Sequence, residues 1–474
     1  MAAESRLAGE LVEHILLYLL HDTPSLQRCS LASRQWCAFA QPLIFRSVNI
    51  EEVTPSPSKN NDASATKPSK KVKGVVKDPT VVLGKCDIAN WARDLVGVGK
   101  SVKNLEINCR TLVASEMAKI LAVFRTPQRI LVTADLIEDS AKHLPSLSRP
   151  LKELRLTNLK FDMNDWTPVR DPTKKRSRKR AKCALVQFLN LFGEVETLYT
   201  LDVYPVGGTG EESRDGAGYN VCRCCRPMYP EDSGHRSAIR AEGMKLSKNF
   251  SVRRVITSDT DYSKAQEGQE VVLDLLLSSP SVMNAVRELE IDEHPVMSRE
   301  LLEATGAQLT RLRLSVTYPS RQGDNGPSEY GTWCCGPQLT FAHICLHHNY
   351  AMPNIIDNYW QGYNTTVQRT IRDLPETLPH LVIEFNCGKL LPDHFDWHLV
   401  DEMLVNRDLA QLELIFKIGI HELLKEDYEQ FSRSTRRSIP RLGDKLGSKL
   451  IVEVMERPRG KKPNHLYGLN AALI

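Results

Sequence analysis

Val286-Arg-Glu-Leu-Glu-Ile291 and Leu309-Thr-Arg-Leu-Arg-Leu314 share one pattern, in which apolar and polar residues alternate. Such alternation is typical of a strand that buries one of its two faces. The pattern recurs at Val102–Ile107, Leu151–Leu156 and Leu409–Leu414. Weaker copies are found at Arg129–Thr133, Val195–Leu201, Arg253–Ile256, Phe341–Leu346, His380–Phe385 and Lys449–Val454. The sequence therefore predicts a strand at each of these places.

Helical patterns separate several of the expected strands. In these segments apolar residues recur every three or four positions, which is typical of a helix with one buried face. The segments are Met117–Phe124, Ala184–Phe192, Val271–Leu277 and Trp397–Leu404. A strand followed by a helix, repeated along a chain, predicts parallel strands with helices on the outside. We therefore expect an α/β fold.

The spacing of the strand copies favours an irregular leucine-rich-repeat-like solenoid of parallel strands with outer helices. Leu289 and Leu312 hold equivalent positions 23 residues apart, which is within the range of leucine-rich repeats. Repeats of this kind bury their apolar faces by stacking on one another. Other intervals are longer, and the asparagine ladder of regular repeats has only a partial match at Asn158. A globular α/β sheet with the same alternation is the alternative.

The first fifty residues have a different pattern, which begins with an amphipathic helix. Leu7, Leu11 and Ile15 lie four residues apart and form one apolar stripe. Val12 and Leu16 belong to a second stripe beside the first. The combined apolar face is wider than a single surface helix needs.

Two further helices and a strand are expected next. Pro24 suits the first position of a helix, where no amide donor is needed, and Asp22 can cap that helix. A third helix is expected over residues 31–40, with Pro42 ending it, and a strand over residues 44–50. Three short helices make only a small core, so the surplus apolar surface would suit a partner helix or groove. A helical cap that closes the following domain is the alternative.

The run from Leu7 to Trp36 resembles an F-box, and Leu43–Ile50 is similar to the F-box ending of large families in mushroom-forming fungi. The resemblance covers residues 4–50 and departs from the family at Ala8, where proline is usual. It implies that the chain binds the Skp-type adaptor of an SCF ubiquitin ligase. It also implies which residues contact the adaptor or hold the helices together, without separating the two roles. These residues are Leu7, Leu11, Ile15, Leu16, Pro24, Leu26, Cys29, Leu31 and Trp36.

We therefore expect an F-box at residues 1–50, a linker at 51–83 and the repeat-like region at 84–474. The linker is rich in proline, serine and lysine and poor in large apolar residues, which is typical of a solvated segment. Insertion loops are expected near residues 166–182, 205–236 and 319–337.

The expected function is that of a substrate-recognition adaptor of an SCF-type ligase. In this interpretation the F-box binds the Skp-type adaptor and the solenoid binds a target protein, whose identity the sequence does not show. The alternative is a repeat-based protein-interaction scaffold that serves no ligase.

Short motifs that suggest chemistry are incomplete. Gly97–Ser101 looks like the end of a phosphate-binding loop, but the first glycine of that motif is missing. Cys222-Arg-Cys-Cys225 with His235 lacks the second pair of ligands of a zinc site. His394 and His398 have the spacing of metal ligands on a helix, without the glutamate of the metalloprotease motif. We expect no catalytic activity, no cofactor and no metal.

The charge is nearly balanced, with 62 basic and 58 acidic residues, which argues against nucleic-acid binding by the chain as a whole. The sequence predicts no membrane helix and no signal peptide. The twelve cysteines are expected to be reduced thiols, as in the cytoplasm or nucleus. The basic run Lys174–Lys182 is expected to be an exposed loop, with a nuclear localisation signal as one interpretation.

Overall fold

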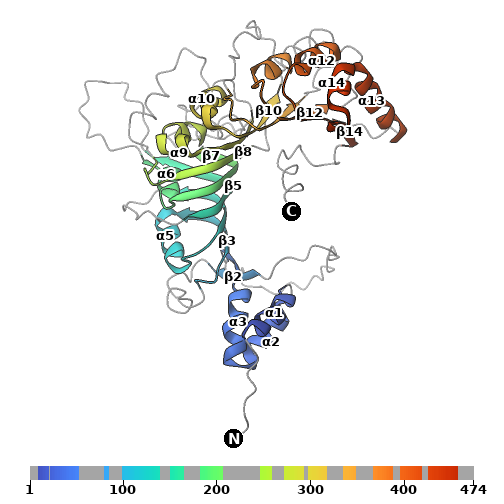
Figure 1. Cartoon of the computed structure of the whole chain (residues 1–474). Coiled ribbons are helices and arrows are strands. Elements are labelled where there is room, and N and C mark those ends of the chain that lie inside the picture. Colours follow the sequence, from blue (N-terminus) through green and yellow to red (C-terminus); the bar gives the residue numbers. More distant parts are fainter. Residues whose placement is uncertain are drawn as a thin grey trace, which may run out of the picture. The chain divides into compact units, whose positions relative to one another are not determined.

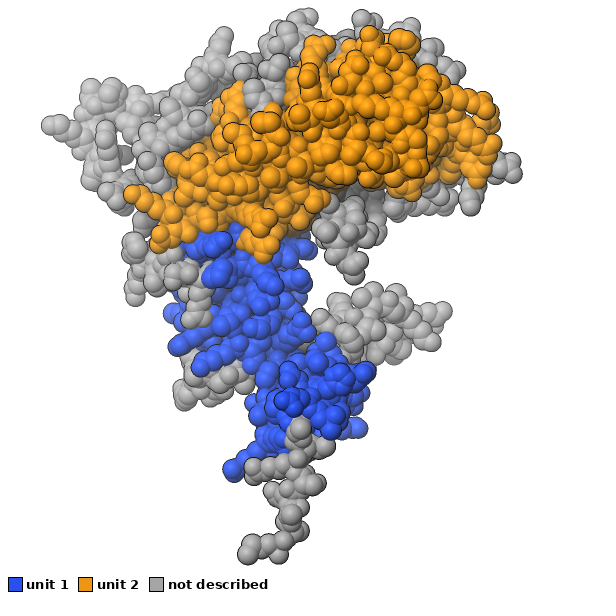
Figure 2. Space-filling model, in the orientation of Figure 1, with its two compact units in different colours: residues 1–195, 205–223 blue, residues 196–204, 224–474 orange. Residues whose placement is uncertain are grey.

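The computed structural model places two compact units along the chain, shown as a cartoon in Figure 1 and in separate colours in Figure 2. Unit 1 consists of residues 1–195 and 205–223, and unit 2 of residues 196–204 and 224–474. The structure describes residues 9–20, 22–52, 80–84, 99–138, 150–164, 182–206, 246–258, 272–292, 297–317, 335–347, 367–387, 395–418 and 425–456. No helix within these ranges is long and apolar enough to cross a membrane.

Unit 1 begins with three helices and continues into a parallel sheet. The helices are α1 (Gly9–Tyr18), α2 (Thr23–Ala32), α3 (Arg34–Ile44), α5 (Ala114–Val123) and α6 (Ala184–Leu189). The strands are β1 (Ser47–Glu51), β2 (Thr80–Gly84), β3 (Asn104–Val113), β4 (Arg129–Glu138), β5 (Leu151–Asn164) and β6 (Lys182–Cys183). Strands β2, β1, β3, β4 and β5 lie side by side in that order and pair in parallel. Strand β6 pairs antiparallel with the end of β5.

The structure corrects four expected boundaries in unit 1. Thr80–Gly84 forms strand β2, so the linker predicted over residues 51–83 ends earlier than expected; valines 81 and 82 and leucine 83 favour a strand. Helix α3 continues past Pro42 to Ile44, because a proline in the last turn removes few helical hydrogen bonds. Strand β1 therefore begins later than predicted. Leu31 belongs to the last turn of α2, since Ser33 ends α2 and caps α3.

Unit 2 contains strands and helices in alternation. The strands are β7 (Glu194–Val206), which belongs mostly to this unit, β8 (Ser251–Ser258), β9 (Glu288–Asp292), β10 (Arg311–Thr317), β11 (Phe341–His347), β12 (His380–Cys387), β13 (Gln411–Ile418) and β14 (Leu450–Glu456). The helices are α9 (Pro280–Ala285), α10 (Met297–Thr305), α12 (Trp397–Val405), α13 (Lys425–Ser438) and α14 (Pro440–Leu446), with further helical residues at 272–277 and 367–373. From β8 to β14 each strand pairs in parallel with the next strand of the chain. Helices α12, α13 and α14 lie together beside β12 and β14 in Figure 1.

The strands of unit 2 are in register, so equivalent apolar residues form rows across the sheet. One row joins Leu289, Leu312, Ala342, Leu381 and Leu412, all of which are buried. Every copy of the alternating sequence pattern, strong or weak, contributes to a strand. The predicted α/β class with parallel strands is therefore confirmed, as are the four predicted helical segments as far as the structure describes them.

Several expectations lie outside the described residues. These are most of the linker, almost all of the three insertion loops, the basic run up to residue 181, the cysteines of residues 222–225 with His235, His394, and the first two residues of Gly97–Ser101.

Arg407 links the end of α12 to the helix of residues 367–373 in unit 2. It follows α12, and its guanidinium donates hydrogen bonds to the carbonyl oxygens of Ile371 and Leu374 at 2.6 Å each. It also donates to those of Arg372 and Pro375. Carbonyl groups at the end of a helix have no partner within the helix. One buried arginine side chain therefore caps the helix of residues 367–373 from a distant part of the sequence.

We expect Arg407→Met to lower the free energy of unfolding of unit 2 by about 2–4 kcal/mol, because buried carbonyl groups would lose charged donors. Hydrogen exchange of the full chain, followed by mass spectrometry, should show faster exchange at residues 367–387. The control is Arg433→Met, since Arg433 is exposed and its ion pair with Glu429, one helical turn away, is a surface pair that contributes little. Equal effects of the two variants would contradict the capping role.

Candidate functional site

The three N-terminal helices form a small core of their own. Two side chains cap helices: Asp22 accepts a hydrogen bond from the Ser25 amide at 3.1 Å, and Ser33 accepts one from the Trp36 amide at 3.3 Å. The Ser25 hydrogen bonds lower the pKa of Asp22, since they favour its charged form. The core itself consists of Val12, Leu16, Leu26, Ala40 and Ile44.

Gly9 allows α1 and α3 to approach each other closely. A side chain at Gly9 would place its Cβ 3.1 Å from the ring of Phe39. That is closer than most carbon atoms pack without a shift of the ring. A larger residue at this position would therefore require the Phe39 ring to shift by a few tenths of an ångström.

Other large apolar side chains of the helices stay in contact with solvent. Leu31 is 85% exposed and Leu11 48%, although both are fully apolar. Exposed apolar residues also include Ile15, Leu17 and Tyr18 in α1. Single exposed apolar residues are common on protein surfaces, but a group of five on two short helices makes this segment a candidate interaction site.

The structure separates the residues that the F-box resemblance names. Leu11, Ile15 and Leu31 are exposed, as is Pro24 in the first turn of α2. Leu16 and Leu26 are buried in the core, and Cys29 and Trp36 pack against it. Leu7 lies outside the described residues. Leu17 and Tyr18 were not predicted as contact residues; both lie within one helical turn of Ile15.

Comparison with known proteins adds nothing to this geometry. No protein-family model matches the chain, and no curated protein is significantly similar to it.

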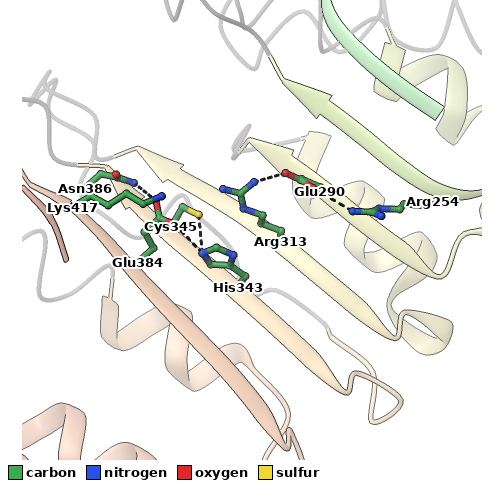
Figure 3. A network of polar contacts seen from close by, with 8 residues as sticks. All are labelled: Arg254, Glu290, Arg313, His343, Cys345, Glu384, Asn386 and Lys417. Atoms are coloured by element: carbon green, nitrogen blue, oxygen red, sulfur yellow. Dashed lines mark hydrogen bonds and ion pairs between the residues drawn. The ribbon is translucent and has the colours of Figure 1, made fainter. Parts of the chain in front are cut away.

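A second candidate site is a polar arrangement that crosses the sheet of unit 2, on the face opposite the buried apolar row (Figure 3). Eight side chains from six neighbouring strands form it, and we call it the charged ladder. They are Arg254, Glu290, Arg313, His343, Cys345, Glu384, Asn386 and Lys417. Glu290, Arg313 and Glu384 are each less than a tenth exposed. Charges buried to this degree need partners, because the loss of hydration is costly.

The first half of the charged ladder is a chain of ion pairs. Glu290 on β9 pairs with Arg313 on β10 through a short contact, and with Arg254 on β8 at 3.7 Å. Arg254 also lies 3.7 Å from Glu288. Removal of Glu290 would thus leave Arg254 with one acidic partner, while Arg313 would lose its nearest carboxylate.

The second half of the charged ladder centres on Glu384. Its Oε2 lies 3.1 Å from His343 Nε2, and its Oε1 lies 2.8 Å from Lys417 Nζ. Asn386 Nδ2 donates to the same Oε1 at 2.9 Å. His343 Nε2 is also 3.4 Å from Cys345 Sγ. The two halves thus place opposite charges next to each other along consecutive strands.

These contacts shift the acid–base equilibria of the charged ladder. Burial alone would lower the pKa of His343, but the Cys345 sulfur and the Glu384 carboxylate outweigh it and raise this pKa to about 9. Burial alone would likewise raise the pKa of Glu384, but His343 and Lys417 hold it well below its usual range. Both shifts favour the charged forms that pair with each other.

The sequence analysis considered other histidines and cysteines and missed this group. His343 and Cys345 are two residues apart on β11, and Glu384 is 41 residues from His343. The available signal was a polar residue at alternate positions of two predicted strands. Only the register of β11 and β12 shows that these positions are neighbours.

We expect Leu16→Ala to lower the stability of the N-terminal helices by about 2–5 kcal/mol, because it removes a fully buried side chain from a small core. Leu11→Ala, the same substitution on the exposed side of α1, should change it by about 0.5 kcal/mol or less. Hydrogen exchange over residues 9–45 of the full chain measures both. Similar losses in the two variants would show that Leu11 belongs to the core.

We expect Glu290→Leu to destabilise unit 2 by about 3–5 kcal/mol, because it removes the closest partner of a buried guanidinium. The double variant Glu290→Leu, Arg313→Leu should lose less than the sum of the two single variants. Denaturant unfolding of the four proteins measures this coupling. Additive losses would mean that the contact contributes no pairwise energy.

Proposed function

We propose that this protein is the substrate receptor of an SCF-type ubiquitin ligase. Its N-terminal helices bind the Skp-type adaptor, and its repeat-like region binds a target protein. The observation that carries the proposal is the division of apolar residues in the first helices. Leu16 and Leu26 build the core, while Leu11, Ile15 and Leu31 remain exposed and correspond to the apolar positions of an F-box.

The exposed residues suit a helix-binding protein partner. Apolar side chains on one amphipathic helix and its neighbour are the usual anchors when helices dock into an apolar groove. Aromatic and large aliphatic residues at the centre of such an interface contribute most of its binding energy. Tyr18 is 80% exposed and forms an edge contact with His14 only 5.3 Å away, so it already has a defined position beside the leucines.

The rest of the chain supports an irregular leucine-rich-repeat-like solenoid as the target-binding part. Consecutive strands β8 to β14 are neighbours in chain order, which is the arrangement of stacked repeats. Intervals between strands vary, and the regular asparagine ladder is missing, so the repeats are irregular. The protein would catalyse nothing itself; it would raise the local concentration of its target near the ligase. Such a receptor acts in the cytoplasm or nucleus.

We expect the double variant Leu11→Asp, Ile15→Asp to bind a Skp-type adaptor at least about 100-fold more weakly than the natural chain, because each new carboxylate would lose its hydration in an apolar interface. Calorimetric titration of the purified full chain with the adaptor measures the affinity. Both residues are exposed, so the fold should be unaffected, which hydrogen exchange over residues 9–45 checks.

The matched control is Ile451→Asp, which places the same charge at an exposed apolar residue of β14 in unit 2. This variant should bind the adaptor as the natural chain does. If the natural chain fails to bind at micromolar concentration, the ligase proposal is wrong, and a repeat-based scaffold without a ligase becomes the better description.

A further inference from the structure

Three potential metal ligands meet in the second half of the charged ladder. His343 Nε2, Cys345 Sγ and a Glu384 carboxylate oxygen all lie within 4.8 Å of one another. They come from two adjacent strands, β11 and β12, whose register places Cys345 beside Glu384. Imidazole, thiolate and carboxylate are the three ligand types that zinc uses in proteins.

The spacing of these atoms is close to that of a tetrahedral zinc site. Zinc bonds of about 2.3 Å to sulfur and about 2.0–2.1 Å to nitrogen or oxygen imply a sulfur–nitrogen separation of about 3.6 Å at the tetrahedral angle. The same bond lengths imply about 3.3 Å between nitrogen and oxygen. The observed separations are 3.4 Å for Cys345 and His343, and 3.1 Å for His343 and Glu384. These two separations match the tetrahedral values to within a few tenths of an ångström, and the third pair, Cys345 and Glu384, lies within 4.8 Å.

We propose that His343, Cys345 and Glu384 bind one Zn²⁺ ion through Nε2, Sγ and Oε2. Water would occupy the fourth position. Ser315 provides an independent indication of that position: it pairs in register with Cys345 from β10 and is 5% exposed. Its hydroxyl has no hydrogen-bond partner within the described part of the chain. Buried hydroxyls are normally satisfied, and a metal-bound water would satisfy this one.

The surroundings of the site hold the carboxylate in the orientation that a metal requires. Lys417 and Asn386 both contact Glu384 Oε1, and Oε2 is directed to His343. Hydrogen bonds that orient a ligand in this way are typical of protein metal sites.

Two positive groups lie near the site. Arg313 pairs with Glu290 and also forms a hydrogen bond with Cys345, and Lys417 pairs with Glu384. Zinc binds a neutral imidazole and a thiolate, so its binding competes with protons at these two side chains.

The test uses the full chain in a background in which Cys222, Cys224 and Cys225 are replaced by alanine, since that cysteine run could bind zinc by itself. Equilibrium dialysis with Zn²⁺, followed by elemental analysis, should find one ion per chain in this background. Glu384→Gln, which is nearly isosteric, and Cys345→Ala should each weaken binding at least tenfold. The control Cys109→Ala, which removes a thiol from a strand of unit 1, should bind zinc normally.

Cobalt provides a second readout that does not depend on the variants folding. Co²⁺ added to the background protein should give a thiolate-to-cobalt absorption band and the spectrum of a four-coordinate ion. Circular dichroism identifies any variant that fails to fold, and for such a variant the cobalt result decides. Absence of zinc binding by the background protein, unchanged binding by Glu384→Gln, or a cobalt spectrum without the thiolate band would each overturn the proposal.

Discussion

The parallel register of neighbouring strands is the constraint on which the rest of this structure depends. Each strand directs alternate side chains to opposite faces, so a shared register collects equivalent residues into rows. In unit 2 the row through Leu312 is apolar and buried, and no single strand could bury its apolar face without its neighbours. The same register places Arg313, one residue later, in a polar row on the other face. Core and charged ladder are thus two results of one alignment.

The N-terminal helices connect directly to the parallel sheet of unit 1. Helix α3 ends at Ile44, and strand β1 inserts between β2 and β3 three residues later. The carbonyl oxygen of Arg46 accepts hydrogen bonds from the amides of Lys103 and Asn104 at 2.9 and 3.0 Å. Residues 47–50 therefore belong both to the segment that resembles an F-box and to the sheet of unit 1. A receptor of the proposed kind gains from such a connection, because a short, hydrogen-bonded joint limits the distances at which its target can be held.

The sequence could predict the elements whose signal is local. Alternating apolar and polar residues, as at Val286–Ile291, identified every strand that carries this pattern. The signal is local, because each half-buried strand must have apolar residues on one of its own two faces. The strand at Thr80–Gly84 was not predicted, because the lysines and prolines before it led to the assignment of this short apolar run to a linker. The sequence also failed to separate Leu11 from Leu16, since both lie on the wide apolar face of one helix. Only the positions of α2 and α3 decide which of these two leucines is covered.

The group of His343, Cys345 and Glu384 was beyond prediction for a related reason. Its members are separated along the chain and become neighbours only when β11 and β12 align. Shifting β12 by two residues would place Val382 or Asn386 where Glu384 now lies, and would move the carboxylate away from its partner His343. Buried polar groups without partners are costly, so this shifted register would be strongly disfavoured. Lys417 on β13 extends the same argument to the next strand. The charged ladder therefore contributes to the choice of a single register, which the alternation of apolar residues alone leaves open to shifts of two residues.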